Sequence, residues 1–393
     1  MNRQLLLLAL CQGLFFTNNV TFVAINGLVG LQIAPYGWMA TLPLTAYVGG
    51  AALAAQIVAR HQRAWGRKRC FPTGLGVAIV TAGVCAVAAS TRNFWLLLAA
   101  TMAAGYYSAN ASLYRFAAIE LADDAHKEKA ISWVLAGGIL GGVIGPNLAS
   151  ATRDVLPQPF AGAYVALMGV ALLSLLMMSR IEFPPLHDAA SAAQPGRSLR
   201  ELARQPTFVV AIAAAALGYG VMNLLMAATP IAMQQCAHPF SATALVLETH
   251  VLAMFVPSFF TGHLIRAFGV LPVMVVGVLL NLACVVFALS GQDVMHFVGA
   301  LMMLGLGWNF LYIGGTTLFT HAYRAPEKTQ AQAAMDTTVA ATMALTSFSS
   351  GALVTTGGWQ AMNWGSLVPM AAVAAALIWL ARSRARAQSA AST

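Results

Sequence analysis

Long apolar runs are the feature that most constrains this chain. Each run continues for about 20 residues, the length that an α-helix needs to cross the roughly 30 Å hydrocarbon core of a bilayer. Breaks fall where charged residues, Pro and Gly cluster. They separate twelve predicted spans: 4–31, 37–59, 71–90, 94–119, 130–151, 159–179, 207–230, 240–265, 270–290, 294–319, 331–355 and 361–381. The runs do not alternate between apolar and polar residues, so they predict helices and not the strands of a membrane barrel.

Composition agrees with the prediction of membrane-spanning helices, and the motifs that the sequence lacks exclude several classes of function. Hydrophobic residues make up 59% of the chain and charged residues 8%, against about 25% charged residues in an ordinary soluble domain. We therefore predict an all-α integral membrane protein. The sequence contains no HExxH, GxSxG or nucleotide-binding loop, so we expect neither an enzyme nor a self-contained ATP-driven pump, and no permanently bound cofactor.

The basic residues predict the orientation of the spans. If the N-terminus is cytoplasmic, nearly all Lys and Arg residues fall in cytoplasmic gaps or at the termini, and the opposite gaps keep only Arg92 and Arg153. This asymmetry predicts a multi-pass protein with both termini in the cytoplasm, and we infer that its location is the bacterial inner membrane. The net charge of +9 is then explained by topology and by attraction to anionic membrane lipid, and it requires no nucleic-acid partner.

A short motif indicates a duplicated chain. Arg63-Ala64-Trp65-Gly66 follows the second span, and Arg266-Ala267-Phe268-Gly269 follows the eighth. The longest polar stretch, with several Pro and Gly residues, lies between the two sets of six spans. We expect an N-terminal six-helix half at 1–179, a cytoplasmic linker at 180–206, a C-terminal six-helix half at 207–381 and a cytoplasmic tail at 382–393.

Two six-helix halves joined by such a linker resemble the major facilitator superfamily. Gly66, Arg67 and Lys68 match the end of the superfamily's pattern after the second helix, whereas Arg63 departs from it by standing where an aspartate is expected. Arg266 makes the same departure in the second half. The resemblance implies a secondary transporter whose two halves rock about a site near the bilayer midplane.

The fifth span carries a second superfamily-like pattern, Gly141-x-x-x-Gly145-Pro146. This pattern resembles one often seen in exporters. In physical terms its small residues allow another helix to approach closely, and its proline loosens the backbone. We expect it to serve helix packing.

Two pairs of soft donor atoms occur in consecutive spans, Met222 with Met226 and His250 with Met254. Residues four apart share a helix face, and the helical rise places all four near mid-depth in the bilayer or slightly to the outer side of it. Three thioethers and one imidazole are ligands that copper(I) prefers. We therefore predict a metal site between the seventh and eighth spans, although methionine at helical spacing is more often core packing.

MxxxM on the seventh helix and HxxxM on the eighth resemble the CcoA-type copper importers. This resemblance implies import of copper as the transported substrate, supply of copper to assembly of the cbb3-type cytochrome oxidase, and copper chaperones as partners. Transporters in the wider CcoA-like group are associated with riboflavin uptake. An alternative therefore stays open: a proton-coupled transporter of a small organic molecule, such as a riboflavin-like vitamin or a drug.

Other polar or sulfur-bearing side chains have candidate roles. Met233 and Cys236 are candidates for a metal relay on the outer side, and Arg115, Glu120, Glu248 and Asp336 are candidates for coupling or gating. Polar groups within a membrane span are costly and tend to mark pathways. Arg115 and Glu120 are expected to form an ion pair near the cytoplasmic end of the fourth span. Asn309 and Tyr312 in the tenth span can line a cavity or bond between helices, and they suit an organic substrate better than copper.

Overall fold

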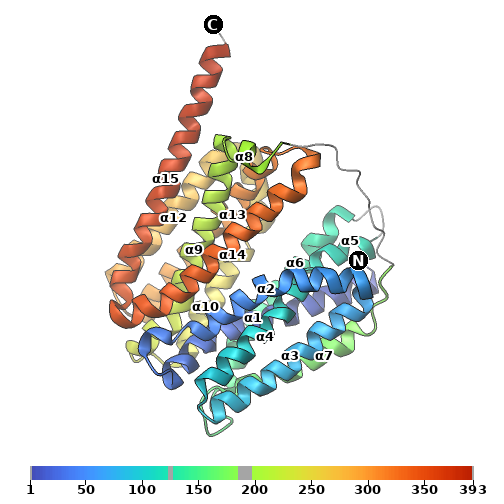
Figure 1. The fold of residues 1–393 in the computed structure, drawn as a ribbon. Helices are drawn as coiled ribbons and strands as arrows, with labels where there is room; N and C mark the ends of the chain where they lie inside the picture. The colour runs from blue at the N-terminus through green and yellow to red at the C-terminus, as the bar shows by residue number, and fades with distance from the viewer. Residues whose placement is uncertain (1, 123–126, 185–196, 392–393) are drawn as a thin grey trace. The chain divides into compact units, whose positions relative to one another are not determined.

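The computed structural model describes residues 2–122, 127–184 and 197–391. Over these ranges the regular structure is helical, without strands (Figure 1). The helices are α1 (Arg3–Ile33), η1 (Gly37–Met39), α2 (Leu42–Trp65), α3 (Arg67–Ser90), α4 (Phe94–Ala111), α5 (Tyr114–Leu121), α6 (Lys127–Thr152), α7 (Ala161–Met178), α8 (Leu199–Leu202), α9 (Pro206–Gln235), α10 (Phe240–Phe255), α11 (Ser258–Phe268), α12 (Val270–Ser290), α13 (Val294–Thr320), η3 (Ala325–Glu327), α14 (Lys328–Thr356) and α15 (Gly358–Ala391).

The helices follow the apolar runs closely, and the predicted all-α class is confirmed. Nine helices within the described ranges are each long and apolar enough to cross a membrane, and the bent pair α10–α11 makes a tenth. The two other predicted spans, 94–119 and 130–151, correspond to α4 with α5 and to α6.

Two spans predicted as continuous helices are broken. The fourth is interrupted at Ser112 and Leu113, between α4 and α5. The eighth bends by 42° at Val256 and Pro257, between α10 and α11. Proline lacks a backbone N–H and clashes with the preceding turn, which accounts for the second break. A prediction from hydropathy does not detect either break, because both spans stay apolar throughout and hydropathy does not depend on backbone hydrogen bonding.

The chain groups into two compact units, which we describe separately. Unit 1 comprises Met1–Asp188, Ala227–Leu252 and Ser350–Thr356, and unit 2 comprises Ala189–Met226, Ala253–Ser349 and Gly357–Thr393. Residues 185–196 of the predicted linker lie outside the described ranges. The predicted tail from residue 382 continues α15 as a helix to Ala391, and residues 392–393 also lie outside these ranges.

In unit 1, α1 packs closely against α6 (Figure 1). A Cβ atom added to Gly137 would lie 2.1 Å from the Ala9 carbonyl oxygen, and one added to Gly141 would lie 2.4 Å from that of Gly13. The Thr21 hydroxyl also donates to the Gly145 carbonyl at 3.0 Å. The glycine pattern of the fifth span therefore serves helix packing, as predicted.

The core of unit 1 lies where α1 and α6 meet α3, α4, α5 and α7. Its largest fully buried side chains include Phe71, Tyr107 and Tyr114. Edge-to-face contacts join Phe71 to Tyr114, with ring centroids 4.9 Å apart. Such contacts between aromatic rings stabilise packing beyond the area that they bury.

The duplicated motif ends a helix in both places where it occurs. Gly66 follows α2 with φ of +69°, and Gly269 follows α11 with φ of +89°. Each glycine N–H donates at 2.9 Å to a carbonyl four residues earlier, that of Gln62 or Ile265. Only glycine adopts this backbone conformation without strain. The next helix starts directly afterwards, so the motif makes a tight turn between two spans.

In unit 2, α12 packs against α13 and α15, and α9 contacts both α13 and α14. A Cβ atom added to Gly218 of α9 would lie 3.2 Å from Leu311 of α13, and one added to Gly220 would lie 2.6 Å from Thr342 of α14. The two glycines therefore let α9 approach both neighbours closely. This packing fixes the position of α9 directly before Met222, the first residue of the predicted methionine pair.

Candidate functional site

All four predicted copper ligands are buried. The exposed fractions are 3% for Met222, 8% for Met226, 0% for His250 and 6% for Met254. Met222, Met226 and Met254 belong to unit 2 and His250 to unit 1, so their convergence on one ion stays a prediction. No three His, Cys, Asp or Glu side chains gather as a metal site among the described residues. A copper site would therefore depend on the thioethers.

Asn223 anchors the methionine pair of α9 to α14 within unit 2. Its side-chain Nδ2 lies 2.8 Å from the Ser347 hydroxyl, 3.0 Å from that of Thr346 and 3.1 Å from the Met343 carbonyl oxygen. An amide in this position is buried and bonded, so it resists rotation of α9 about its own axis. The faces presented by Met222 and Met226 are fixed accordingly.

The break in the eighth span lies directly after Met254 and is bridged by Asn309 of α13. Asn309 Nδ2 donates to the Met254 carbonyl and to the Ser258 hydroxyl, both at 2.7 Å. The Thr261 hydroxyl donates to Asn309 Oδ1 at 2.7 Å. The asparagine thus satisfies a carbonyl that the helix break exposes, which a membrane interior requires. The prediction that Asn309 bonds between helices is confirmed.

Beside this break, aromatic rings of α9, α10 and α13 form a cluster within unit 2. Trp308 and Tyr312, one turn apart on α13, are stacked with centroids 5.1 Å apart and planes 9° apart. Tyr219 stands nearly perpendicular to both, at 5.3 and 5.4 Å. Phe255 contacts Trp308 from α10 at 6.2 Å. We call Tyr219, Phe255, Trp308 and Tyr312 the aromatic corner.

The aromatic corner adjoins the predicted sulfur ligands of unit 2. Tyr219 precedes Met222 by three residues on one face of α9, and Phe255 follows Met254 directly. Of its four residues, the sequence-based prediction identified only Tyr312. The available signal was the pairing of Trp308 with Tyr312 at i and i+4, which places two rings on one helix face. Nothing in the sequence indicates that Tyr219 contacts Trp308 and Tyr312.

Glu248 faces α6 in unit 1. Its Oε2 accepts a hydrogen bond from Asn147 Nδ2 at 2.9 Å. One turn along α10, Val251 covers Gly142 of α6, where an added Cβ would meet Val251 Cγ1 at 2.4 Å. His250 lies on a different face of the helix, as two residues span about 200°. Glu248 therefore links two helices from a face of α10 that His250 does not share.

The expected ion pair between Arg115 and Glu120 is replaced by another. Glu120 pairs with Arg67, which lies at the start of α3 in the loop motif. The Arg115 side chain is exposed and instead lies over the Phe116 ring, with its Cζ atom 4.8 Å from the ring centroid. Arg115 and Glu120 are five residues apart on α5, which turns their side chains about 140° away from each other around the helix. Asp336 is exposed on α14, and its coupling role stays a prediction.

The two relay candidates differ in accessibility. Met233 is fully buried in the last turn of α9, and its carbonyl accepts the His238 N–H at 3.0 Å. Cys236 is half-buried just beyond this helix, and burial raises the pKa of its thiol. Since the thiolate is the metal-binding form, the raised pKa makes Cys236 a weak ligand at neutral pH. The five cysteines form no disulfide.

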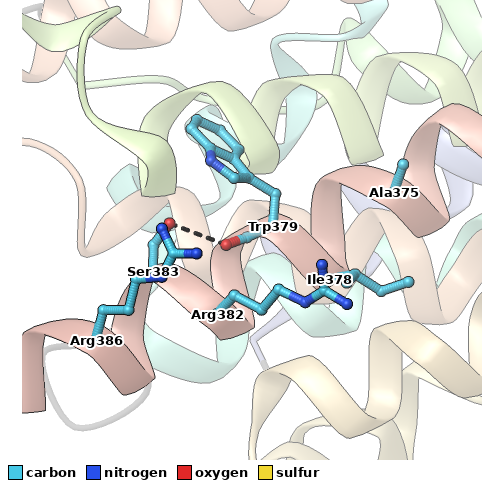
Figure 2. Close-up of a pocket in the computed structure, with 6 residues that line it drawn as sticks. All are labelled: Ala375, Ile378, Trp379, Arg382, Ser383 and Arg386. Atoms are coloured by element: carbon cyan, nitrogen blue, oxygen red, sulfur yellow. Dashed lines mark hydrogen bonds between the residues drawn. The ribbon is translucent and has the colours of Figure 1, made fainter. Parts of the chain in front are cut away.

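A surface pocket on α15 lies apart from these residues in the sequence (Figure 2). Its lining comes from this helix alone: Ala375, Ile378, Trp379, Arg382, Ser383 and Arg386. Figure 2 shows the Ser383 hydroxyl bonded to the Trp379 carbonyl, at 2.9 Å. Tryptophan followed by arginine is typical of the membrane–water boundary, where the rings and long basic side chains anchor a helix. We assign this pocket to anchoring of α15.

Comparison with known proteins identifies the family. The Major Facilitator Superfamily matches residues 5–247 and 211–393. The chain belongs to this superfamily. Its members are membrane transporters, so the predicted multi-pass transporter class is confirmed at this level, whereas membership of the copper-importing subgroup stays a prediction.

Within the superfamily, the chain is 35% identical over 364 residues to the riboflavin transporter RfnT of Brucella anthropi, a match that covers 92% of each protein. Among solved structures, it is similar to the nucleoside transporter NupG, with a TM-score of 0.76, 12% identity and coverage of 96% of this chain and 99% of that one. A bacterial homologue of the human lysosomal transporter Spinster matches with a TM-score of 0.75, 14% identity and 96% coverage of both chains. These structural similarities confirm the superfamily fold.

Proposed function

We propose that this transporter moves a flat aromatic organic molecule of the riboflavin class across the bacterial inner membrane. The observation that carries the proposal is the aromatic corner, in which Tyr219 and Tyr312 are half-buried beside a broken helix. Aromatic walls and a few fixed polar groups are typical of sites for small organic ligands. The similarity to a riboflavin transporter supports the same substrate class.

Proton coupling is part of the proposal, and Glu248 is its best-supported carrier. Glu248 is a half-buried carboxyl within a membrane-spanning helix, where ionisable groups commonly mark proton pathways. Its hydrogen bond from Asn147 joins α10 to α6. Protonation of the carboxylate would weaken that bond, because a charged acceptor bonds more strongly than a neutral one. Loss and gain of a proton would thus alter the link between the two helices.

Copper import is a second candidate, favoured by the burial of Met222, Met226, His250 and Met254. Neutral thioethers bind a soft ion without first losing a proton, so release on the other side needs no acid. Under this candidate the aromatic corner serves packing alone. The copper would then reach chaperones and the cbb3-type cytochrome oxidase in the cell.

Parallel uptake measurements separate the two candidates. Cells that need external riboflavin and lack their own uptake system would express the wild-type chain, Tyr312→Ala or Met226→Leu. We expect wild type and Met226→Leu to take up labelled riboflavin equally. Tyr312→Ala should raise KM about tenfold, since loss of an aromatic contact costs on the order of 1 kcal/mol or more.

Radioactive copper provides the second arm of the experiment. Copper uptake by wild type that falls with Met226→Leu and His250→Leu, together with no riboflavin uptake, would overturn the aromatic substrate and establish copper. Protein amounts in the membrane, measured by immunoblot, serve as the control for each variant.

A further inference from the structure

Trp308 holds a buried polar group that nothing in unit 2 satisfies. Its exposed fraction is 5%, and its indole Nε1 has no hydrogen-bond partner among the described residues. The indole N–H is a donor only, and tryptophan buried in a protein usually finds an acceptor. A donor left unpaired away from water is costly. The cost is explained if a ligand supplies the acceptor.

The rings around Trp308 provide the surface on which such a ligand would lie. Tyr312 is parallel to Trp308, whereas Tyr219 is nearly perpendicular to both rings. Tyr219, Phe255 and Tyr312 are half-buried and Trp308 is buried. For a ligand to reach the indole N–H, one of these half-buried rings would have to turn aside. The ring of the ligand would then contact an aromatic face, and its edge would meet the N–H.

The position of Trp308 is fixed from the neighbouring residue. Asn309 makes hydrogen bonds to Met254, Ser258 and Thr261, each at 2.7 Å. These bonds hold the backbone of α13 against the broken end of α10. A binding group supported in this way loses little conformational entropy when a ligand arrives.

We infer that Trp308 is a specificity-determining residue for the transported molecule. Its indole N–H donates a hydrogen bond to a ring nitrogen or carbonyl oxygen at the edge of a planar heteroaromatic ring, which stacks on Tyr312. The inference rests on the proposed aromatic substrate. It adds that the site selects a substrate with a hydrogen-bond acceptor at the edge of its ring. A cation gains nothing from a donor-only group, so the same N–H gives copper no additional binding.

The test combines one variant with altered ligands. Riboflavin offers edge acceptors at N1, N5, C2=O and C4=O, and the 1-deaza, 5-deaza, 2-thio and 4-thio analogues each remove or weaken one of them. Binding of riboflavin and the analogues to purified full-length protein in detergent would be measured for wild type, Trp308→Phe and Trp379→Phe. The last variant removes an exposed indole on α15 and is the matched control.

We expect Trp308→Phe to raise the Kd for riboflavin about tenfold, the effect of one hydrogen bond, and Trp379→Phe to leave it unchanged. For wild type, one analogue should have a Kd about tenfold higher than that of riboflavin. For Trp308→Phe, the same analogue and riboflavin should have equal Kd values. Wild type that binds all four analogues as tightly as riboflavin would overturn the inference without use of any variant. An unchanged Kd for Trp308→Phe would also overturn it.

Failure of the underlying function gives a different result. Wild-type protein that neither binds nor transports riboflavin would overturn the proposed aromatic substrate itself. Wild-type protein that transports riboflavin, with no analogue distinguished by Trp308, would overturn only the role of this residue.

Discussion

At the scale of single residues, Glu327 shows how surroundings fix a charge. It lies in η3, with 2% of its surface exposed. Arg197 binds both carboxylate oxygens through its guanidinium group, at 2.7 and 2.8 Å, and the backbone N–H groups of Arg197 and Arg324 donate at 2.9 and 2.8 Å. These bonds lower the pKa of Glu327 from 4.5 to about 2. The end of the linker is thereby attached to the turn before α14.

This depressed pKa predicts a specific pH dependence of stability. Because the pKa is lower in the folded protein, the ionised carboxylate stabilises the fold above about pH 4.5, and this contribution is lost as pH falls towards 2. Glu327→Gln should lower the Tm of the purified protein at pH 7. The difference in Tm from wild type should shrink as the pH is lowered from about 5 to 3 in a thermal unfolding series.

The control for this prediction is Asp154→Asn. Asp154 is exposed and lies 3.6 Å from Arg153, and exposed pairs contribute little to stability. Its Tm should match that of wild type across the series. A difference in Tm between wild type and Glu327→Gln that stays constant with pH would contradict the claim that the ionised carboxylate of Glu327 stabilises the fold.

At the scale of elements, the broken eighth span depends on a bond from another helix. Pro257 prevents a continuous ladder of backbone hydrogen bonds, and Asn309 of α13 supplies a donor to the Met254 carbonyl. The break is therefore a property of α10, α11 and α13 together. It also places a carbonyl group, an amide and the aromatic corner next to one another, which a regular helix would not do.

We predict that Asn309→Leu destabilises the protein by about 1–3 kcal/mol, the cost of leaving buried partners unsatisfied. Asn363→Leu is the matched control, because Asn363 is equally buried and, among the described residues, its side chain donates to the Trp359 carbonyl of its own helix and not to another helix. Thermal unfolding in detergent should show a lower Tm for Asn309→Leu and little change for Asn363→Leu. Equal effects of both substitutions would show that the bridge contributes nothing beyond packing.

At the scale of the whole molecule, the distribution of basic residues is expected to set the orientation in the membrane. Arg382, Arg384 and Arg386 continue α15 past its apolar part, whereas only Arg92 and Arg153 stand in the gaps expected outside. Positive charge is retained on the cytoplasmic side of membranes. We accordingly propose that both termini are cytoplasmic.

Fusions test this orientation directly. Green fluorescent protein attached after the last residue should fluoresce, because it folds in the cytoplasm. Alkaline phosphatase attached after Gln158, in the gap between α6 and α7, should be active, because that enzyme matures outside it. An active phosphatase at the C-terminus together with an inactive one after Gln158 would reverse the proposed orientation.

Apolar runs predict most of this fold correctly because each membrane helix satisfies its own backbone hydrogen bonds. The start of α12 at Val270 and its end at Ser290 coincide with the predicted span. Interruptions at Ser112 and Pro257 were not predicted, since a broken span keeps its hydropathy. Proximity in the sequence predicts Arg115 as the partner of Glu120, whereas Arg67 is its partner in space.

The sequence by itself determined that the chain is a helical membrane protein and where most of its spans begin and end, because length and hydropathy are local properties. The tertiary structure decided which side chains meet. Tyr219, Phe255 and Trp308 come from three helices, and Asn309 bonds to a carbonyl 55 residues away. Contacts of this kind depend on how helices pack against one another, and a helix's own sequence specifies only which residues share its faces.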